Sequence, residues 1–359
     1  MNMSVRDVLI IGAGPSGLSA AIAAKRRSLD YQVLEQGVLV NSIYRFPPQM
    51  VFFTTPELLE IGGLPFVSPF DKPTRAEALK YYRKVADRFD LQIAYGEKVL
   101  SVAKGPDGDG ALFTIETETA RGVQRTHFAR AVVMAIGYFD HPVRLGIPGE
   151  DLPHVHHYYG EPHPHYRQRV VIVGGGNSAA ESALEMYRTG AHVTLVHRAA
   201  TLKSTIKYWV RPDIENRIKE GSVAAHFSAA IREIRPASVV IAPAHAAPPP
   251  PPPEVAFPAD GSESFRAPAR AALTGELEIP ADVVYLLTGY RADAELLRGA
   301  GVRLNDRDAP VHDPQTFETN VSGLFVAGGA IAGVDTGTIF IENGRFHGET
   351  IVDVIARRT

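Results

Sequence analysis

The chain has 359 residues, of which 45% are apolar and 21% are charged, and its formal net charge is −3. This length favours two domains, and no apolar run approaches the roughly 18 residues of a membrane-spanning helix. Because 37 basic residues nearly balance 40 acidic ones, the chain lacks a general basic field. We therefore expect neither a nucleic-acid partner nor a membrane.

Cysteine is absent from the sequence. This excludes a disulfide framework, a cysteine-ligated metal and a thiol nucleophile. The first apolar run, residues 8–11, is too short for the core of a secretory signal, so we expect a cytoplasmic protein.

A strand, a glycine-rich turn, a helix and a second strand follow one another near the N-terminus. We expect strands at residues 8–11 and 31–35, and a helix that starts at Gly12-Ala-Gly-Pro-Ser-Gly17 and runs to about residue 28. Gly12 permits the turn, Gly14 lets the backbone approach a pyrophosphate, and Gly17 lets the helix pack on the strand. Glu35 ends the second strand, where a carboxylate can accept both hydroxyls of an adenosine ribose. We infer an FAD site.

The same pattern occurs again at residues 170–197, with Gly174, Gly176 and Ala179 in the turn. His197 and Arg198 stand where the first unit has its glutamate, and Lys203 adds a third basic residue. Cations suit a 2′-phosphate, so we infer NADPH rather than NADH here. Two such sites imply hydride transfer from a nicotinamide to a flavin, a step that needs no acid or base from the protein. We assign no catalytic residue and no metal.

Between and after these units we expect a helix at residues 73–89 with a capping box of Thr74 and Glu77. We expect strands at residues 99–102, 112–117, 131–136 and 282–287, and a last helix from about Thr338 to residue 356, whose N-terminus could face the flavin. The predicted fold class is α/β, with two Rossmann-like, three-layer ββα-type domains. The FAD-binding domain comprises residues 1–141 and 292–359, and the inserted NADPH-binding domain comprises residues 142–291.

Four segments leave alternatives open. Residues 242–257, with six consecutive prolines, form a surface loop or a docking site for a proline-reading partner. The histidines between His154 and His165 form a hinge loop or an opportunistic metal site. Residues 203–219 form a solvated basic helix face or dock an acidic electron carrier. The aromatic segment 41–53 walls the flavin or belongs to the core.

Several runs resemble known flavoproteins. Ala135-Ile-Gly137, Leu287-Thr-Gly289 and Gly323-Leu-Phe-Val-Ala-Gly328 are similar to the two-domain reductases related to thioredoxin reductase. Asn41-Ser-Ile-Tyr44, Phe52-Phe-Thr-Thr55 and Phe340-Ile-Glu-Asn-Gly-Arg-Phe-His-Gly348 resemble the YpdA-type bacillithiol disulfide reductases. The resemblance implies an FAD-containing, NADPH-using homo-oligomer. It also implies a cysteine at the position of Ser16, and an aspartate at Gly329 in the thioredoxin-reductase relatives. This chain has neither, so it cannot carry out thiol–disulfide exchange itself.

These inferences predict two sets of cofactor contacts. The FAD set is Gly12, Gly14, Pro15, Ser16, Gly17, Glu35, Gln36, Asn41, Ser42, Val99, Gly137, Gly328, Gly329, Thr338 and Ile339. The NADPH set is Gly174, Gly176, Asn177, Ser178, Ala179, His197, Arg198 and Lys203. The predicted function is an NADPH-dependent FAD oxidoreductase whose acceptor is a small molecule or a small redox protein. The alternatives are a ferredoxin- or flavodoxin-NADP reductase-like enzyme and a non-enzymatic flavoprotein that senses NADPH.

Overall fold

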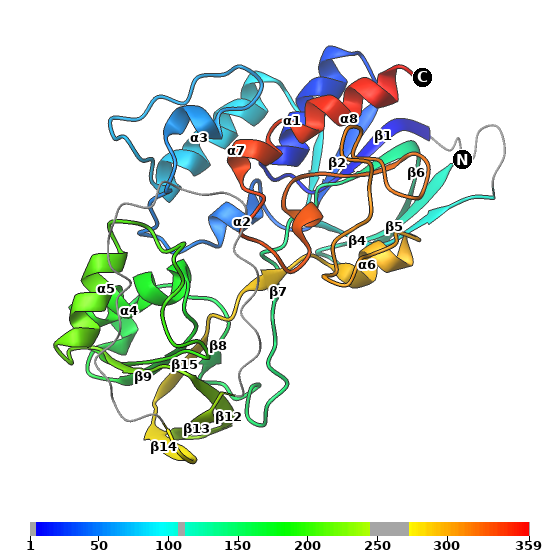
Figure 1. Cartoon of the computed structure of the whole chain (residues 1–359). Helices are drawn as coiled ribbons and strands as arrows, with labels where there is room; N and C mark the ends of the chain where they lie inside the picture. Colours follow the sequence, from blue (N-terminus) through cyan, green and yellow to red (C-terminus); the bar gives the residue numbers. More distant parts are fainter. Residues whose placement is uncertain (1–4, 107–111, 245–272, 359) are drawn as a thin grey trace. The chain divides into compact units, whose positions relative to one another are not determined.

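The computed structural model describes residues 5–106, 112–244 and 273–358. The chain divides into two compact units, shown in Figure 1. Unit 1 comprises Met1–His141 and Tyr290–Thr359, and unit 2 comprises Pro142–Gly289. The first crossing coincides with the predicted boundary before residue 142, and the second lies two residues before the predicted boundary after residue 291. The chain crosses at the short strands β7 (His141–Pro142) and β16 (Tyr290–Arg291).

Unit 1 is built on a seven-stranded sheet in the order β3-β2-β1-β6-β5-β4, with β17 also pairing to β6. Its parallel strands are β1 (Val5–Ile11), β2 (Tyr31–Glu35), β3 (Ile93–Tyr95) and β17 (Leu324–Val326). The antiparallel part comprises β4 (Glu97–Lys104), β5 (Phe113–Thr119) and β6 (Gln124–Met134). β6 also pairs in parallel with β1, so it joins the two parts.

Several helices accompany this sheet. They are α1 (Pro15–Arg26), α2 (Asn41–Tyr44), α3 (Arg75–Arg88), α6 (Ala294–Gly299), α7 (Ile341–Gly344) and α8 (His347–Ala356), with 3-10 turns η1 (Pro56–Leu59) and η3 (Gly328–Ala332). Figure 1 shows α1 and α8 side by side, and a side-chain carbon at Gly348 would lie 2.3 Å from the Ala20 amide nitrogen. The capping box of Thr74 and Glu77 is confirmed at the start of α3.

The predicted last helix is wrong at its start and in its middle. Thr338 lies in a turn, where its hydroxyl donates to the Asp335 carbonyl, and α7 begins only at Ile341. The helix is interrupted before His347, where the Ser16 and Ser19 hydroxyls donate to the Gly344 and Arg345 carbonyls. The expected helix N-terminus at Thr338 therefore does not exist.

Unit 2 contains a five-stranded parallel sheet in the order β11-β10-β9-β15-β8. The strands are β8 (Val155–His156), β9 (Arg169–Val173), β10 (His192–Val196), β11 (Ala224–His226) and β15 (Val283–Leu286). Helices α4 (Asn177–Thr189) and α5 (Arg211–Lys219) and the 3-10 turn η2 (His163–His165) accompany it. A separate antiparallel sheet comprises β12 (Ala229–Arg235), β13 (Ser238–Pro243) and β14 (Leu277–Pro280).

Of the open segments of unit 2, the structure describes the histidine segment but not the prolines. The histidine segment is not a plain hinge loop, because β8 pairs with β15 and the buried His165 bonds to the Tyr285 hydroxyl at 2.7 Å. Residues 245–272, which hold the six prolines, lie outside the described residues. Among the residues that the structure describes, no helix is long and apolar enough to cross a membrane.

Candidate functional site

The first glycine turn joins β1 to α1 in unit 1 and has a shape that only glycine allows at two positions. Gly12 has a φ of +106°, and a side-chain carbon there would lie 2.4 Å from the Ala135 carbonyl oxygen. A side-chain carbon at Gly17 would lie 2.0 Å from the Gly12 carbonyl oxygen. These contacts hold helix and strand at close range, as the sequence analysis expects of this motif.

The outer side of the same turn is open. A side-chain carbon at Gly14 would meet nothing within 4 Å, and Gly14 caps α1 without a side-chain hydrogen bond. Pro15 occupies the first helical position, and no acidic residue lies in the first turn. The first amides of α1 are therefore available to an anion, and the cradle fits the pyrophosphate of a dinucleotide.

Glu35 lies beside this turn and is buried. Its Oε2 accepts the Ala13 amide and its Oε1 accepts the Gly37 amide, both at 2.8 Å. Burial raises the pKa of the carboxyl group, and these two amides oppose the rise. Each carboxylate oxygen can accept a further hydrogen bond, so the arrangement fits a ribose hydroxyl pair.

The other residues of the FAD set differ in their contacts and in their burial. The side-chain amide of Gln36 donates to the Asp140 carboxylate at 2.9 Å, and the Asn41 side chain lies against Gly37. Ser42 lies 3.9 Å from where a side-chain carbon of Gly137 would stand. Val99 is buried in the core, while Thr338 is exposed and Ile339 is half-buried.

The aromatic segment 41–53 is divided between core and surface. Phe52 is buried, and Phe46 packs edge-on against Phe139 with ring centroids 5.0 Å apart. Tyr44 and Phe53 are exposed.

Ser16 does not present its hydroxyl to the open side of the turn. The hydroxyl donates to the Gly344 carbonyl at 3.0 Å, and a side-chain carbon at Gly328 would lie 2.4 Å from the Ser16 oxygen. At the next position, a side-chain carbon of Gly329 would lie 2.6 Å from the ring of Tyr138. Tyr138, which the sequence analysis missed, thus fills the space beside Gly329. Its place directly after Gly137 was the available signal.

The second glycine turn, in unit 2, repeats this construction between β9 and α4. Gly174 has a φ of +154°, and a side-chain carbon there would lie 2.6 Å from the Leu287 carbonyl and 3.0 Å from Ala179. Gly176 caps α4 without a side-chain hydrogen bond, and Ser178 in the first turn is exposed. This turn also fits a dinucleotide pyrophosphate.

Asn177 fixes the loop that follows β10. Its Oδ1 accepts the Lys207 amide at 2.8 Å, and its Nδ2 donates to the Thr205 carbonyl at 3.1 Å. The Lys203 amide donates to the Gly175 carbonyl at 2.9 Å. The Lys203 stem passes 3.7 Å from where a side-chain carbon of Gly176 would stand. The lysine is therefore held beside the glycine turn.

The three basic residues of the NADPH set differ in charge. His197 is buried with its ring against Gly175, and burial, with the nearby Lys203 and Arg198, lowers its pKa to about 4. It is therefore neutral at neutral pH, unlike the cation that the sequence analysis expected. Arg198 and Lys203 are exposed and have no acidic partner within the described ranges. These two residues supply the positive charge.

Most cations of the basic stretch 203–219 are paired with acids. Lys207 lies 2.6 Å from Glu181, and Arg211 lies 2.8 Å from Glu215. Arg217 contacts both Asp213 and Glu220. The stretch therefore offers an acidic carrier much less free charge than its composition suggests.

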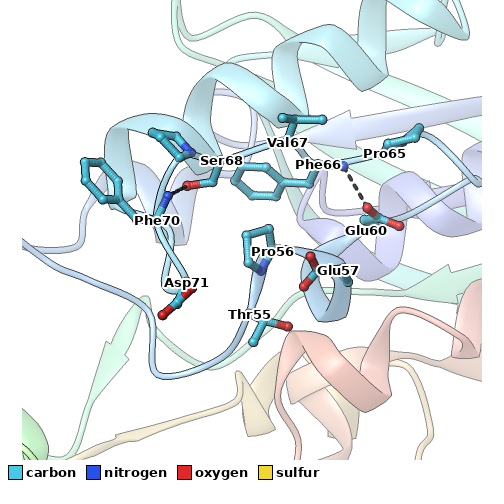
Figure 2. A pocket seen from close by; sticks show the side chains of 11 residues that line it. Thr55, Pro56, Glu57, Glu60, Pro65, Phe66, Val67, Ser68, Phe70 and Asp71 are labelled. Carbon is cyan, nitrogen blue, oxygen red and sulfur yellow. Dashed lines mark hydrogen bonds between the residues drawn. The ribbon is translucent and has the colours of Figure 1, made fainter.

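A separate cavity of about 500 Å³ lies in unit 1, between η1 and the segment that follows it (Figure 2). Prolines, aromatic rings and carboxylates line it. The Glu60 carboxylate accepts the Phe66 amide at 2.8 Å, so part of its polar lining serves to hold the loop. None of the residues of the FAD set lines this cavity. In the part of the chain that the structure describes, no group of three or more His, Cys, Asp or Glu residues could hold a metal ion.

The chain is similar to known flavoproteins over nearly its whole length. The family model "Pyridine nucleotide-disulphide oxidoreductase" matches residues 9–246 and 269–328. The bacilliredoxin reductase Bdr of Bacillus subtilis is 38% identical over 357 residues, which cover 99% of both chains. The solved structure of the bacillithiol disulfide reductase Bdr (YpdA) from Bacillus cereus is 35% identical and has a TM-score of 0.87, covering 99% of this chain and 100% of that one. A ferredoxin–NADP reductase of Ignicoccus hospitalis is 25% identical over 90% of both chains.

Proposed function

The chain belongs to the pyridine nucleotide-disulphide oxidoreductase family, and on that premise we propose that it is a bacilliredoxin-reductase-type enzyme that reduces its acceptor without a thiol of its own. Family membership confirms the expected enzyme class, an NADPH-dependent flavoprotein oxidoreductase of the thioredoxin-reductase-like type. It also confirms FAD and NADPH as the cofactors and the two-domain α/β fold.

We propose that the turn of unit 1 holds FAD. The open face of Gly14 and the first amides of α1 would bind its phosphates, and Glu35 would accept its ribose hydroxyls. We assign the NADPH pyrophosphate to the turn of unit 2, with Arg198 and Lys203 at the 2′-phosphate. The chemistry that the two cofactors supply when bound is hydride transfer from nicotinamide to flavin.

The observation that carries this proposal is the pair of glycine turns, each at the start of a helix that has no side-chain cap. The protein's part is to bind, orient and shield the reactants rather than to transfer protons. Since the sequence contains no cysteine, the chain cannot form a mixed disulfide with an acceptor. The acceptor must therefore take its electrons from the flavin directly.

Sequence similarity supports a disulfide as the acceptor, because the similar Bacillus cereus structure is that of a bacillithiol disulfide reductase. The test is an anaerobic panel in which the purified holoenzyme and NADPH are mixed in turn with bacillithiol disulfide, an oxidised bacilliredoxin, a ferredoxin and a quinone. Turnover with the disulfide or the bacilliredoxin supports the proposal. Turnover with the ferredoxin alone contradicts it.

A ferredoxin- or flavodoxin-NADP reductase is the second candidate, and the absence of cysteine favours it. Reduced flavin can donate single electrons, so such a carrier needs no thiol in the enzyme. The pairing of Lys207, Arg211 and Arg217 with acids weakens the docking surface proposed for an acidic carrier. For this reason we rank the carrier second.

We also propose a cytoplasmic setting, a small-molecule or small-protein acceptor, and a homo-oligomer. The resemblance to the bacillithiol disulfide reductases supports the oligomer. Analytical ultracentrifugation of the holoenzyme tests it, and a single monomeric species at micromolar concentration would contradict it.

A further inference from the structure

His347 is a buried residue at the start of α8 with an unusual partner. Its Nδ1 accepts a hydrogen bond from the backbone amide of Gly328 at 3.1 Å. Gly328 begins η3, two residues after β17, with a φ of +63°, a conformation that glycine adopts readily. The bond therefore joins the first turn of α8 to the turn that contains Gly328 and Gly329.

The ring of His347 is held in place by stacking. It lies on Phe317, with ring centroids 4.2 Å apart and an angle of 23° between the planes. The Phe317 carbonyl accepts the Val326 amide of β17 at 3.0 Å. The ring of His312 also stacks on Phe317, with ring centroids 6.0 Å apart. Burial, together with the nearby His312, lowers the pKa of His347 to about 4. At neutral pH its Nδ1 therefore keeps the lone pair that accepts the amide.

The amide that His347 holds lies where the FAD turn is assembled. A side-chain carbon at Gly328 would lie 2.4 Å from the Ser16 oxygen, and one at Gly344 would lie 3.2 Å from the Gly328 α-carbon. Ser16 stands in the first turn of α1 and donates to the Gly344 carbonyl. A shift of Gly328 would thus push directly on the helix N-terminus assigned to the FAD phosphates.

We propose that His347 is a positioning residue for FAD, whose Nδ1 fixes the turn of Gly328 and Gly329 against the start of α1. The inference rests on the proposed FAD site. It assigns to a neutral imidazole, buried behind the turn, the role of keeping the cofactor cradle in shape. His347 touches neither the open face of Gly14 nor Glu35 in this arrangement, so it acts through Gly328.

The test compares three variants of the full chain. His347→Leu removes the acceptor, His347→Asn supplies another one, and His312→Leu alters the same aromatic stack without touching the Gly328 amide. The dissociation constant of FAD is measured by quenching of flavin fluorescence, and amide hydrogen exchange is followed in the peptide that contains Gly328. We expect about tenfold weaker FAD binding and faster exchange in His347→Leu, the size expected for one buried hydrogen bond. His347→Asn and His312→Leu should stay within about threefold of the native value.

Two results would overturn the inference. One is unchanged FAD affinity and exchange in His347→Leu. The other is equal weakening in His347→Asn and His347→Leu, which would make ring packing rather than the lone pair responsible. If the native chain itself binds no FAD, the proposed function fails instead, while the exchange measurement still reports on the bond between His347 and Gly328.

Discussion

Removal of the positive charge at Arg198 or Lys203 tests the assignment of NADPH to unit 2. Both side chains are exposed and have no acidic partner among the described residues, so the charge of each is free to meet a 2′-phosphate. A charged hydrogen bond contributes about 1.5–3 kcal/mol when buried, and exposure to solvent reduces this to about 1 kcal/mol here. Each alanine variant should therefore lower kcat/KM for NADPH about fivefold, and the double variant about 30-fold.

NADH lacks the 2′-phosphate, so its kcat/KM should change by less than about twofold in all three variants. The assay is steady-state turnover with a saturating dye acceptor and each nicotinamide in turn. Lys219→Ala is the matched control, because Lys219 is also an exposed lysine, at the far end of α5. Equal losses with NADPH and NADH, or no loss in the double variant, would refute the assignment.

Three further predictions concern the first glycine turn, Ser16 and the buried His197. Gly12→Ala should lower the free energy of unfolding by about 2–4 kcal/mol in urea melts, because it combines a positive φ with a contact of 2.4 Å, whereas Gly14→Ala should change stability little. Ser16→Cys should gain alkylation-sensitive turnover of bacillithiol disulfide, and the buried Ser19→Cys should not. No gain in Ser16→Cys would contradict a substrate-accessible position at residue 16. The pKa of His197 is about 4 in the fold and about 6.5 in the unfolded chain, so the unfolded state binds a proton first as the pH falls. The free energy of unfolding should therefore decrease by up to about 3 kcal/mol between pH 7 and pH 4, and His197→Phe should remove this decrease. An equal decline in both proteins would contradict the buried, neutral imidazole.

The two strand–turn–helix units were predictable because their signals are local. The strand at residues 31–35 and the cap at Thr74 occur where the sequence places them, since β-branched runs, glycines and capping residues act over a few positions. The backbone that Gly12 and Gly174 approach is distant in sequence, at Ala135 and Leu287, but the glycines that permit the approach stand in short motifs. The sequence alone therefore predicts the two glycine turns.

The errors arise where distant residues decide the structure. The last helix is interrupted where Ser16 and Ser19, more than 300 positions away, donate hydrogen bonds to its carbonyls, and no local pattern predicts these contacts. β8 forms because the segment with His156 reaches β15 in space.

The free positive charge of His197 and Lys207 could not be judged from the sequence, because it depends on burial and on ion pairing. His197 loses its charge by burial, and Lys207 forms an ion pair with Glu181. Composition alone counts both as free cations. Only the structure distinguishes these two residues from Arg198 and Lys203, which are exposed.

The central claim is that electrons pass through bound FAD with no sulfur relay in the chain, and an anaerobic titration with NADPH tests it directly. The visible absorption of the purified holoenzyme is followed as NADPH is added in small steps. With no cysteine to store a second electron pair, one equivalent of NADPH should bleach the flavin completely, and further NADPH should cause no additional reduction. A colourless protein that takes up no FAD, or one that consumes two equivalents of NADPH per flavin, would contradict the account.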